Sequence, residues 1–173
     1  MGSSLLARLD ARDRALFLRW AMSPSAGARR IWVATTHLGG LRMTALAAGL
    51  PLVLGSGAVR SAGILAALGL VLSHGVIQVI KRSVVRERPS VAVGVEALVN
   101  LPDEFSFPSG HATAAMAVAF AFALVFPTWG APLVALAAIV GLSRVYLGVH
   151  FPGDVVAGQV IAIATDLLLA KLI

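Results

Sequence analysis

The chain has 173 residues, of which 58% are hydrophobic and only 13% are charged, and its mean hydropathy is +0.90. These values exclude an ordinary soluble domain and indicate an integral membrane protein. Because cysteine is absent, disulfides, thiolate catalysis and cysteine-based metal sites are also excluded. The formal charge of +6 comes without a nucleic-acid-binding motif, so the basic residues are expected to meet anionic lipid headgroups and not nucleic acid.

The N-terminal segment LLARLDARDRALFLRW, residues 5–20, mixes apolar side chains with four arginines. This mixture predicts a helix that lies in the headgroup region of a bilayer, and we assign residues 1–40 to an interfacial amphipathic region. The segment lacks the long apolar core and small-residue cleavage site of a signal peptide, so the first span is expected to direct insertion itself.

Long apolar runs follow this segment. A transmembrane helix needs about 20 mainly apolar residues. Runs without acidic or basic residues predict spans at 43–59 and 61–80, and the run 105–143 is long enough to cross twice if it turns at the Pro- and Gly-containing residues 127–132. The run 155–173, interrupted only by Asp166 and Lys171, predicts a fifth span.

The predicted fold is therefore all-α: an integral membrane helical bundle of about five transmembrane helices with an amphipathic N-terminal segment. We expect one domain over residues 1–173. The polar segment 81–107 links the second and third spans, and the predicted site lies beside this loop.

Three polar clusters lie at the ends of the predicted spans. They are KRSVVRERP from Lys81, PSGH from Pro108 and SRVYLGVHFPGD from Ser143. Span two ends at the first cluster, span three begins at the second, and span four ends and span five begins at the third. All of these ends face the same side of the membrane, so one site can contain the three clusters.

The residues of these clusters suit a phosphate group. Lys81, Arg88 and Arg144 bring three positive charges, and an arginine can bind phosphoryl oxygens through two parallel hydrogen bonds. The PSGH sequence at a helix start adds unpaired backbone N–H groups and the positive end of the helix dipole. Pro108 suits a first helical turn, and Gly110 allows an oxyanion to approach closely.

His111, His150 and Asp154 could perform chemistry on that phosphate. His150 and Asp154 are four residues apart, and so share a face if the segment is helical. A carboxylate bonded to one ring nitrogen leaves the other nitrogen free to act as a nucleophile. We expect His150 to attack phosphorus, His111 to protonate the departing oxygen, and water to hydrolyse the phosphohistidine with His111 as base. Because cationic side chains and a helix terminus can stabilise the charge, no metal and no cofactor are expected.

The joint spacing reads Lys81-x6-Arg88-Pro89, Pro108-Ser109-Gly110-His111 and Ser143-Arg144-x5-His150-x3-Asp154. This pattern resembles the three-part signature of the type 2 phosphatidic acid phosphatase (PAP2) family, whose members include membrane lipid phosphatases and vanadium haloperoxidases. The resemblance covers residues 81–154. It implies His150 as nucleophile, His111 as general acid and Asp154 as the partner of the nucleophile. The phosphate ligands that it implies are Lys81, Arg88, Ser109, Gly110 and Arg144.

The resemblance also implies a function, a metal-independent phosphatase that acts on a membrane lipid headgroup. Candidate substrates are phosphatidic acid, phosphatidylglycerol phosphate and polyprenyl diphosphates, and the sequence leaves the choice among them open. A vanadate-dependent haloperoxidase would share the anion site, but such proteins are soluble and much larger. A catalytically silent lipid-phosphate binding or transport protein would need the cations but not His150 with its carboxylate. Integral members commonly have six spans, whereas five are predicted here.

Several polar residues receive structural interpretations. His74 and Gln78 share one face of the second span and are expected to hydrogen-bond to neighbouring helices. Arg86 is expected to attract anionic lipid or to be ordinary interfacial charge. Asp103 is expected to temper the charge of the loop, and Asp166 to face the bundle or a polar cavity.

The membrane face of the site follows from the distribution of basic residues. With five spans, every Lys and Arg except Arg60 and Lys171 lies on the side of the site. The positive-inside rule then predicts the cytoplasmic face of the plasma membrane. Three of those cations are required by the site, however, and most bacterial lipid phosphatases of the family are thought to act on the outer face, so the face stays open.

Overall fold

The computed structural model describes residues 5–20, 25–101 and 103–172. This part of the chain folds into eight helices, and its only strand-like pairing is an isolated antiparallel bridge between Glu87 and Phe105. The predicted all-α fold is therefore confirmed. The helices are α1 Leu5–Trp20, α2 Ala26–His37, α3 Leu41–Leu54, α4 Gly57–Ser83, α5 Pro89–Ala92, α6 Gly110–Val125, α7 Pro127–Tyr146 and α8 Pro152–Leu169.

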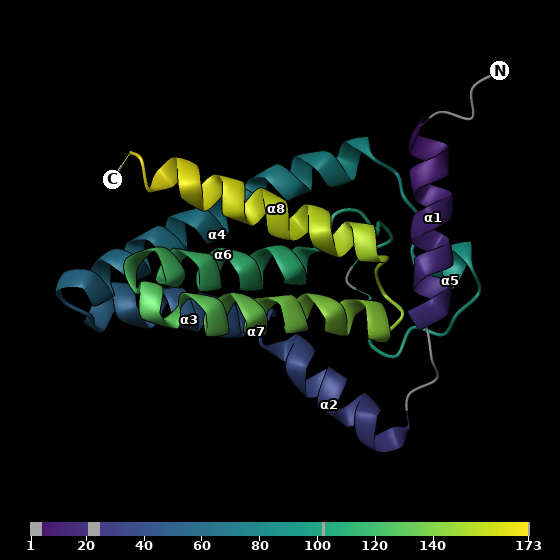
Figure 1. Cartoon of the computed structure of the whole chain (residues 1–173), viewed down its shortest axis with the longest axis horizontal. Helices are drawn as coiled ribbons and strands as arrows, with labels where there is room; N and C mark the ends of the chain where they lie inside the picture. Colours follow the sequence, from purple (N-terminus) through teal and green to yellow (C-terminus); the bar gives the residue numbers. More distant parts are fainter. Residues whose placement is uncertain (1–4, 21–24, 102, 173) are drawn as a thin grey trace.

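Five apolar helices, α3, α4, α6, α7 and α8, pack into a bundle and overlap the segments predicted as spans (Figure 1). Within the described residues, α4, α7 and α8 are each long and apolar enough to cross a membrane. The pair α2 and α3, bent by 44° at its break, passes the same test as a fourth span, and α6 is a shorter apolar helix of 16 residues. By length and composition, the described residues therefore contain three spans, or four if α2 and α3 form one, whereas five were predicted.

Two of the predicted boundaries between spans lie elsewhere in the structure. The first lies at 55–56, before Arg60, because Gly57 begins α4 with a φ of +52°, a conformation that only glycine adopts without steric cost. The second consists of Phe126 alone. Pro127 occupies the first turn of α7, where its missing N–H costs nothing, and Pro132 lies inside that helix.

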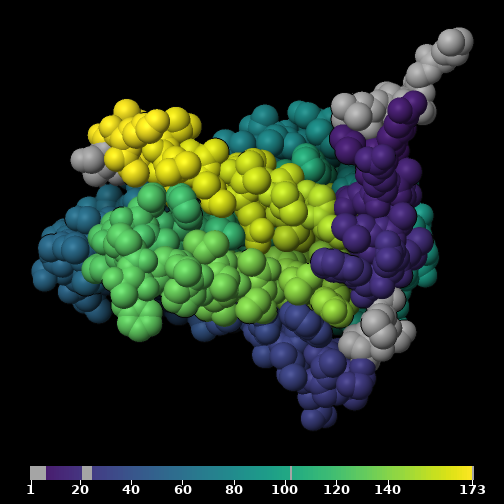
Figure 2. Space-filling view, viewed as in Figure 1, coloured from purple at the N-terminus to yellow at the C-terminus, as the bar shows by residue number. Residues whose placement is uncertain are grey.

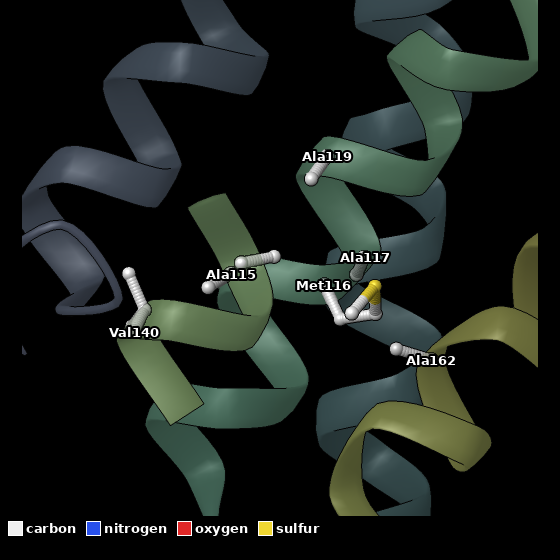
Figure 3. Packing of buried hydrophobic residues seen from close by; sticks show 7 residues of the cluster. Ala115, Met116, Ala117, Ala119, Val140 and Ala162 are labelled. Carbon is white, nitrogen blue, oxygen red and sulfur yellow. The ribbon is translucent and has the colours of Figure 1, made fainter. Parts of the chain in front are cut away.

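The centre of the bundle is α6, which contacts α3, α4, α7 and α8. Ala115, Ala117 and Ala119 of α6 are buried with Val140 of α7 and Ala162 of α8 (Figure 3). In hydrocarbon, helices associate through close packing and hydrogen bonds, and small side chains allow their backbones to approach. The alanine-rich sequence of α6 therefore suits a helix that is surrounded by others.

The predicted amphipathic helix, α1, lies across one end of the bundle, away from the C-terminus (Figure 1). It packs against the end of α7 and the start of α8 (Figure 2). Its Phe17 is fully buried, with the ring centroid 5.3 Å from that of Phe151, whereas Leu9, Leu18 and Trp20 are exposed. Of the predicted interfacial region 1–40, residues 1–4 and 21–24 lie outside the described part of the chain.

Candidate active site

The three polar clusters meet at the end of the bundle that α1 crosses. A cavity of about 590 Å³ opens there between the ends of the helices. Two predicted site residues, Ser109 and Asp154, are fully buried and are not among those that line this cavity. The predicted residues that do line it are Lys81, Arg88, Gly110, His111, Arg144 and His150.

The second cluster forms the start of α6. Ser109 is the N-cap and the helix begins at Gly110, so Pro108 precedes the helix and does not occupy its first turn as predicted. The Ser109 N–H donates to the carbonyl oxygen of Asp154 at 3.0 Å. Gly110 and His111, whose N–H groups have no partner within the helix, line the cavity.

His111 follows in the first turn of α6 and lines the cavity. Its ring makes no hydrogen bond with the side chains and backbone that the structure describes. The link between α2 and α3 lies against it, since a Cβ on Gly39 would come within 2.7 Å of the His111 carbonyl oxygen. Glycine at this position therefore permits the close approach that covers one side of the cavity.

His150 lies in the short linker between α7 and α8 and is 2% exposed. Its Nδ1 donates to the carbonyl oxygen of Ser106 at 2.7 Å, which leaves Nε2 as the unprotonated nitrogen. Nε2 is 3.3 Å from Nη1 of Arg88. Burial, together with the charges of Arg144 and Arg88, lowers the pKa of His150 to about 4, against the opposing effect of Asp154. The ring is therefore neutral near pH 7.

Asp154 lies beside His150, but the two side chains do not form the hydrogen bond that the sequence predicted. Its Oδ2 is 3.7 Å from Nδ1 of His150, close enough to stabilise a charged ring but too far for a hydrogen bond. Its partners are the N–H of Phe151 at 2.8 Å, the hydroxyl of Ser106 and the guanidinium of Arg86, each of the last two at 2.5 Å. Ser106 therefore orients the ring, and Asp154 supplies the neighbouring charge.

The two cations of the first cluster converge on one carboxylate. Asp103 accepts from Nζ of Lys81 at 2.8 Å and from Nη2 of Arg88 at 2.6 Å. Burial would raise the pKa of Asp103, but hydrogen bonds and charges from Lys81 and Arg88 lower it below its ordinary value. The sequence predicted Asp103 only as general loop charge, because nothing in its spacing marks it as the partner of both cations.

Arg144 brings a donor that the protein leaves unused. Its Nη1 donates to the hydroxyl of Thr36 in α2 at 2.7 Å, while its Nε is buried and has no partner among the described residues. The hydroxyl of Ser109 is also buried and has no hydrogen-bond partner among the described residues. Buried polar groups are nearly always hydrogen-bonded, so these donors suit the oxygens of a bound anion.

From its charged end the cavity continues along an apolar wall of α3 and α4. Leu41, Leu70 and Val71 line this wall. His74 and Gln78 line it as well, with Nε2 of His74 3.1 Å from the amide nitrogen of Gln78. The prediction that these two side chains hydrogen-bond to neighbouring helices is therefore wrong, because they contact each other on the cavity wall.

Sequence comparison identifies the family to which this site belongs. A sequence model of the PAP2 superfamily matches residues 62–173, more than half of the chain. The chain belongs to the PAP2 superfamily. The match includes all three clusters of this PAP2 protein and confirms the resemblance that their spacing predicted.

Named relatives of this PAP2 chain include two prenyl-lipid phosphatases. It is 47% identical over 94 residues to a decaprenylphosphoryl-5-phosphoribose phosphatase of Mycolicibacterium smegmatis, a match that covers 52% of this chain and 48% of the relative. It is 36% identical over 110 residues to an undecaprenyl-diphosphatase of Bacillus subtilis, covering 64% and 55%. The chain thus spans about half the length of these relatives.

A solved structure has the same fold. A transmembrane PAP2-type phosphatidylglycerolphosphate phosphatase from Bacillus subtilis superposes with a TM-score of 0.75 at 24% identity, over 95% of this chain and 86% of the other. A protein with this fold is an integral membrane helical bundle. Among the described residues of the PAP2 chain, no group of three or more His, Asp or Glu is placed to hold a metal ion.

Proposed function

We propose that this PAP2 protein removes a phosphate group from a membrane lipid phosphate or diphosphate. The observation that carries the proposal is a buried histidine, His150, whose unprotonated Nε2 faces Arg88 in a cavity that also contains Arg144 and His111. A pure phosphate-binding protein would need the arginines but not a neutral imidazole directed at the bound group. The names of the two prenyl-lipid relatives support the same reaction.

The proposed reaction has two steps. In the first, Nε2 of His150 forms a bond to phosphorus, the bond from phosphorus to the leaving oxygen breaks, and His111 gives that oxygen a proton. Asp154 stabilises the charge that develops on the ring. In the second step, water attacks the phosphohistidine, His111 accepts its proton, and His150 leaves as a neutral ring.

The phosphate oxygens would be held by the cationic end of the cavity. Lys81, Arg88 and Arg144 offset the charge of the transition state, and the first N–H groups of α6, beginning at Gly110, add the helix terminus. The unpaired donors on Arg144 and Ser109 would then have partners. No step in this scheme needs a metal ion, and we therefore expect activity to survive chelation.

The apolar wall supports a substrate with a long hydrocarbon chain, and the polar pair on it favours a polyprenyl-linked phosphate. Gln78 and His74 precede Lys81 by three and seven residues on one helix face, about 4.5 and 10.5 Å along the axis. A sugar hydroxyl or a second phosphate, placed between the reacting phosphate and the chain, would lie beside them. Phosphatidic acid has only ester groups at that depth.

We further propose that residues 1–173 form one domain in the plasma membrane, with 1–40 at the interface and the loop 81–107 beside the site on the cytoplasmic face. The excess of Lys and Arg on that side supports the cytoplasmic assignment. The chain lacks cysteine, so Glu104→Cys, in the exposed part of the loop, provides a single label site. An impermeant maleimide should label it only after cells are opened, and labelling of intact spheroplasts would assign the outer face.

The catalytic proposal is tested by phosphate release from purified protein in detergent with EDTA. The substrates are phosphatidic acid, phosphatidylglycerol phosphate, undecaprenyl diphosphate and decaprenylphosphoryl-5-phosphoribose. We expect one of the two prenyl substrates to be hydrolysed fastest, and His150→Ala to reduce the rate by at least about 1,000-fold. Binding of a lipid without any release would instead support the silent lipid-phosphate binding protein.

A further inference from the structure

Arg86, which lies outside the predicted site, joins the candidate catalytic residues to the surface helix α1. Its Nη1 pairs with Oδ1 of Asp154 at 2.5 Å. Its Nη2 pairs with Asp10 and with Asp13, each at 2.8 Å, and its Nε donates to Asp10 at 3.1 Å. The side chain is only 14% exposed. The prediction that Arg86 attracts lipid or is ordinary interfacial charge is therefore wrong.

The contacts on the side of α1 are equally specific. Oδ1 of Asp13 accepts from the N–H of Gly153, in the first turn of α8, at 2.8 Å. A Cβ at Gly153 would lie 2.7 Å from Oδ2 of Asp13, so a larger residue there would displace this carboxylate. The guanidinium of Arg86 also lies 4.4 Å from the centroid of the Phe151 ring, and Phe17 of α1 packs on the edge of that ring.

The charges along this chain of contacts alternate. The carboxylate of Asp154 is fully buried, and a buried charge must be paired. Arg86 is the cation bonded to it, and Asp10 and Asp13 hold the other edge of the same guanidinium. Burial would lower the pKa of Arg86, but the three carboxylates raise it, so the pair stays ionised. Because Arg binds through a rigid fork, fixing one edge aims the other.

We propose that Arg86 is a positioning residue for the Asp154–His150 pair and that α1 holds it in place through Asp10 and Asp13. The catalytic arrangement is then complete only when α1 is docked across the end of the bundle. This role rests on the proposed function, since the positioned residues are those assigned to phosphohistidine formation. It gives the N-terminal helix, which contributes no residue to the three clusters, a part in catalysis.

The kinetic test compares Arg86→Gln with Arg82→Gln, a change of the same chemistry at an exposed residue four positions earlier in the chain that makes no hydrogen bond or ion pair with a described site residue. On the prenyl substrate that the wild type hydrolyses fastest, Arg86→Gln should lower kcat by about 10- to 100-fold, the loss expected for one charge-assisted hydrogen bond. KM should stay within about threefold, because Lys81, Arg88 and Arg144 remain. Arg86→Lys should recover part of the rate, and Arg82→Gln should match the wild type.

The contribution of α1 is measured by a double-mutant cycle. Asp10→Asn with Asp13→Asn should lower kcat about three- to tenfold alone but add little to Arg86→Gln, because the acidic pair acts through that arginine. Losses that simply multiply would overturn the link to α1. Melting temperatures of all variants separate a positioning effect from unfolding, and guanidinium ion added to Arg86→Ala should restore turnover, whereas urea should not.

A readout that does not depend on turnover keeps the two proposals distinguishable. The ¹⁵N resonances of the His150 ring should shift in Arg86→Gln and in the Asp10, Asp13 variant, but not in Arg82→Gln. If no lipid is hydrolysed by the wild type yet these shifts are seen, the proposed function fails and the positioning role stands. Unchanged ring resonances together with wild-type kcat in Arg86→Gln would overturn the inference.

Discussion

At the scale of single residues, the nucleophile candidate is held by a residue from outside the three clusters. The carbonyl oxygen of Ser106 accepts from Nδ1 of His150, and its hydroxyl donates to Asp154. One residue thus fixes both the tautomer of the ring and the direction of the carboxylate. A carboxylate bonded to Nδ1 would have fixed only the tautomer of the ring.

The protonation state of His150 gives a prediction at this scale. Because its pKa is lowered to about 4, the ring should remain neutral through pH 5, where a histidine of ordinary pKa, near 6.5, is mostly protonated. ¹⁵N spectra of histidine-labelled protein in detergent, with His150→Gln for assignment, should show this ring unchanged from pH 7 to pH 5. Titration centred near pH 6.5 would contradict the buried, cation-flanked environment.

Asp103 gives a second prediction. A bound phosphate would compete with this carboxylate for Lys81 and Arg88, since Asp103 contacts both. Asp103→Asn removes the negative charge but keeps a side chain of the same shape. We expect inorganic phosphate to inhibit this variant at roughly 3- to 10-fold lower concentration than the wild type, the size of a partly exposed ion pair. Glu104→Gln, at the exposed neighbouring position, is the control, and weaker inhibition in Asp103→Asn would assign Asp103 to orienting the cations.

At the scale of elements, the site depends on close contact between α6 and α8. Gly158 of α8 faces the first turn of α6, where a Cβ would lie 2.5 Å from the Thr113 hydroxyl and 2.8 Å from the Ser109 carbonyl oxygen. The same two helices bring Asp154 to Ser109. The geometry of the site is therefore sensitive to the separation of these helices.

Gly158→Ala tests that sensitivity. The added methyl group meets backbone as well as side-chain atoms, so we expect a loss of stability of about 1–3 kcal/mol and a lower kcat. Gly75→Ala in α4 is the matched control, because a Cβ there meets nothing within 4 Å. Thermal unfolding in detergent measures the stability of both variants, and phosphate release measures their kcat. Equal behaviour of the two variants would show that the helices can separate without affecting the site.

At the scale of the whole molecule, the cavity joins a cationic end to an apolar wall between α3 and α4. In the proposed reaction, a lipid would place its phosphate among these cations while its chain remains in hydrocarbon. Asp166 does not share in this arrangement: it is fully buried in α8 beside Gly69 of α4, and its carboxylate oxygens have no partner among the described residues.

The polar pair on the apolar wall predicts substrate preference. His74→Ala combined with Gln78→Ala should reduce kcat/KM about 10- to 100-fold for decaprenylphosphoryl-5-phosphoribose, because the loss of one or two hydrogen bonds costs this much. Hydrolysis of phosphatidic acid should change less than about threefold. Leu72→Ala, on an exposed part of α4 outside the cavity, is the control. Equal losses of kcat/KM on both lipids would show that His74 and Gln78 do not contact the group by which the two lipids differ.

Local patterns in the amino-acid sequence predicted the all-α membrane class, which the structure confirms, and a set of candidate site residues. Hydropathy marks the apolar helices because it reports on runs of about 20 neighbouring residues. The spacings from Lys81 to Arg88 and from Arg144 to His150 are equally local, and the mixture of apolar and basic residues in 5–20 predicted the helix α1.

The residues that support the candidate site became visible only in the folded structure. Ser106 and His150 are 44 residues apart, Asp10 and Arg86 are 76 apart, and Asp13 and Gly153 are 140 apart. Such pairs depend on how separate helices cross and on where glycines let them approach. Neither the crossing nor the approach produces a periodic pattern or a fixed spacing in the sequence. The candidate cationic and catalytic groups could be predicted from local pattern, whereas the groups that contact and orient them depend on how the helices pack.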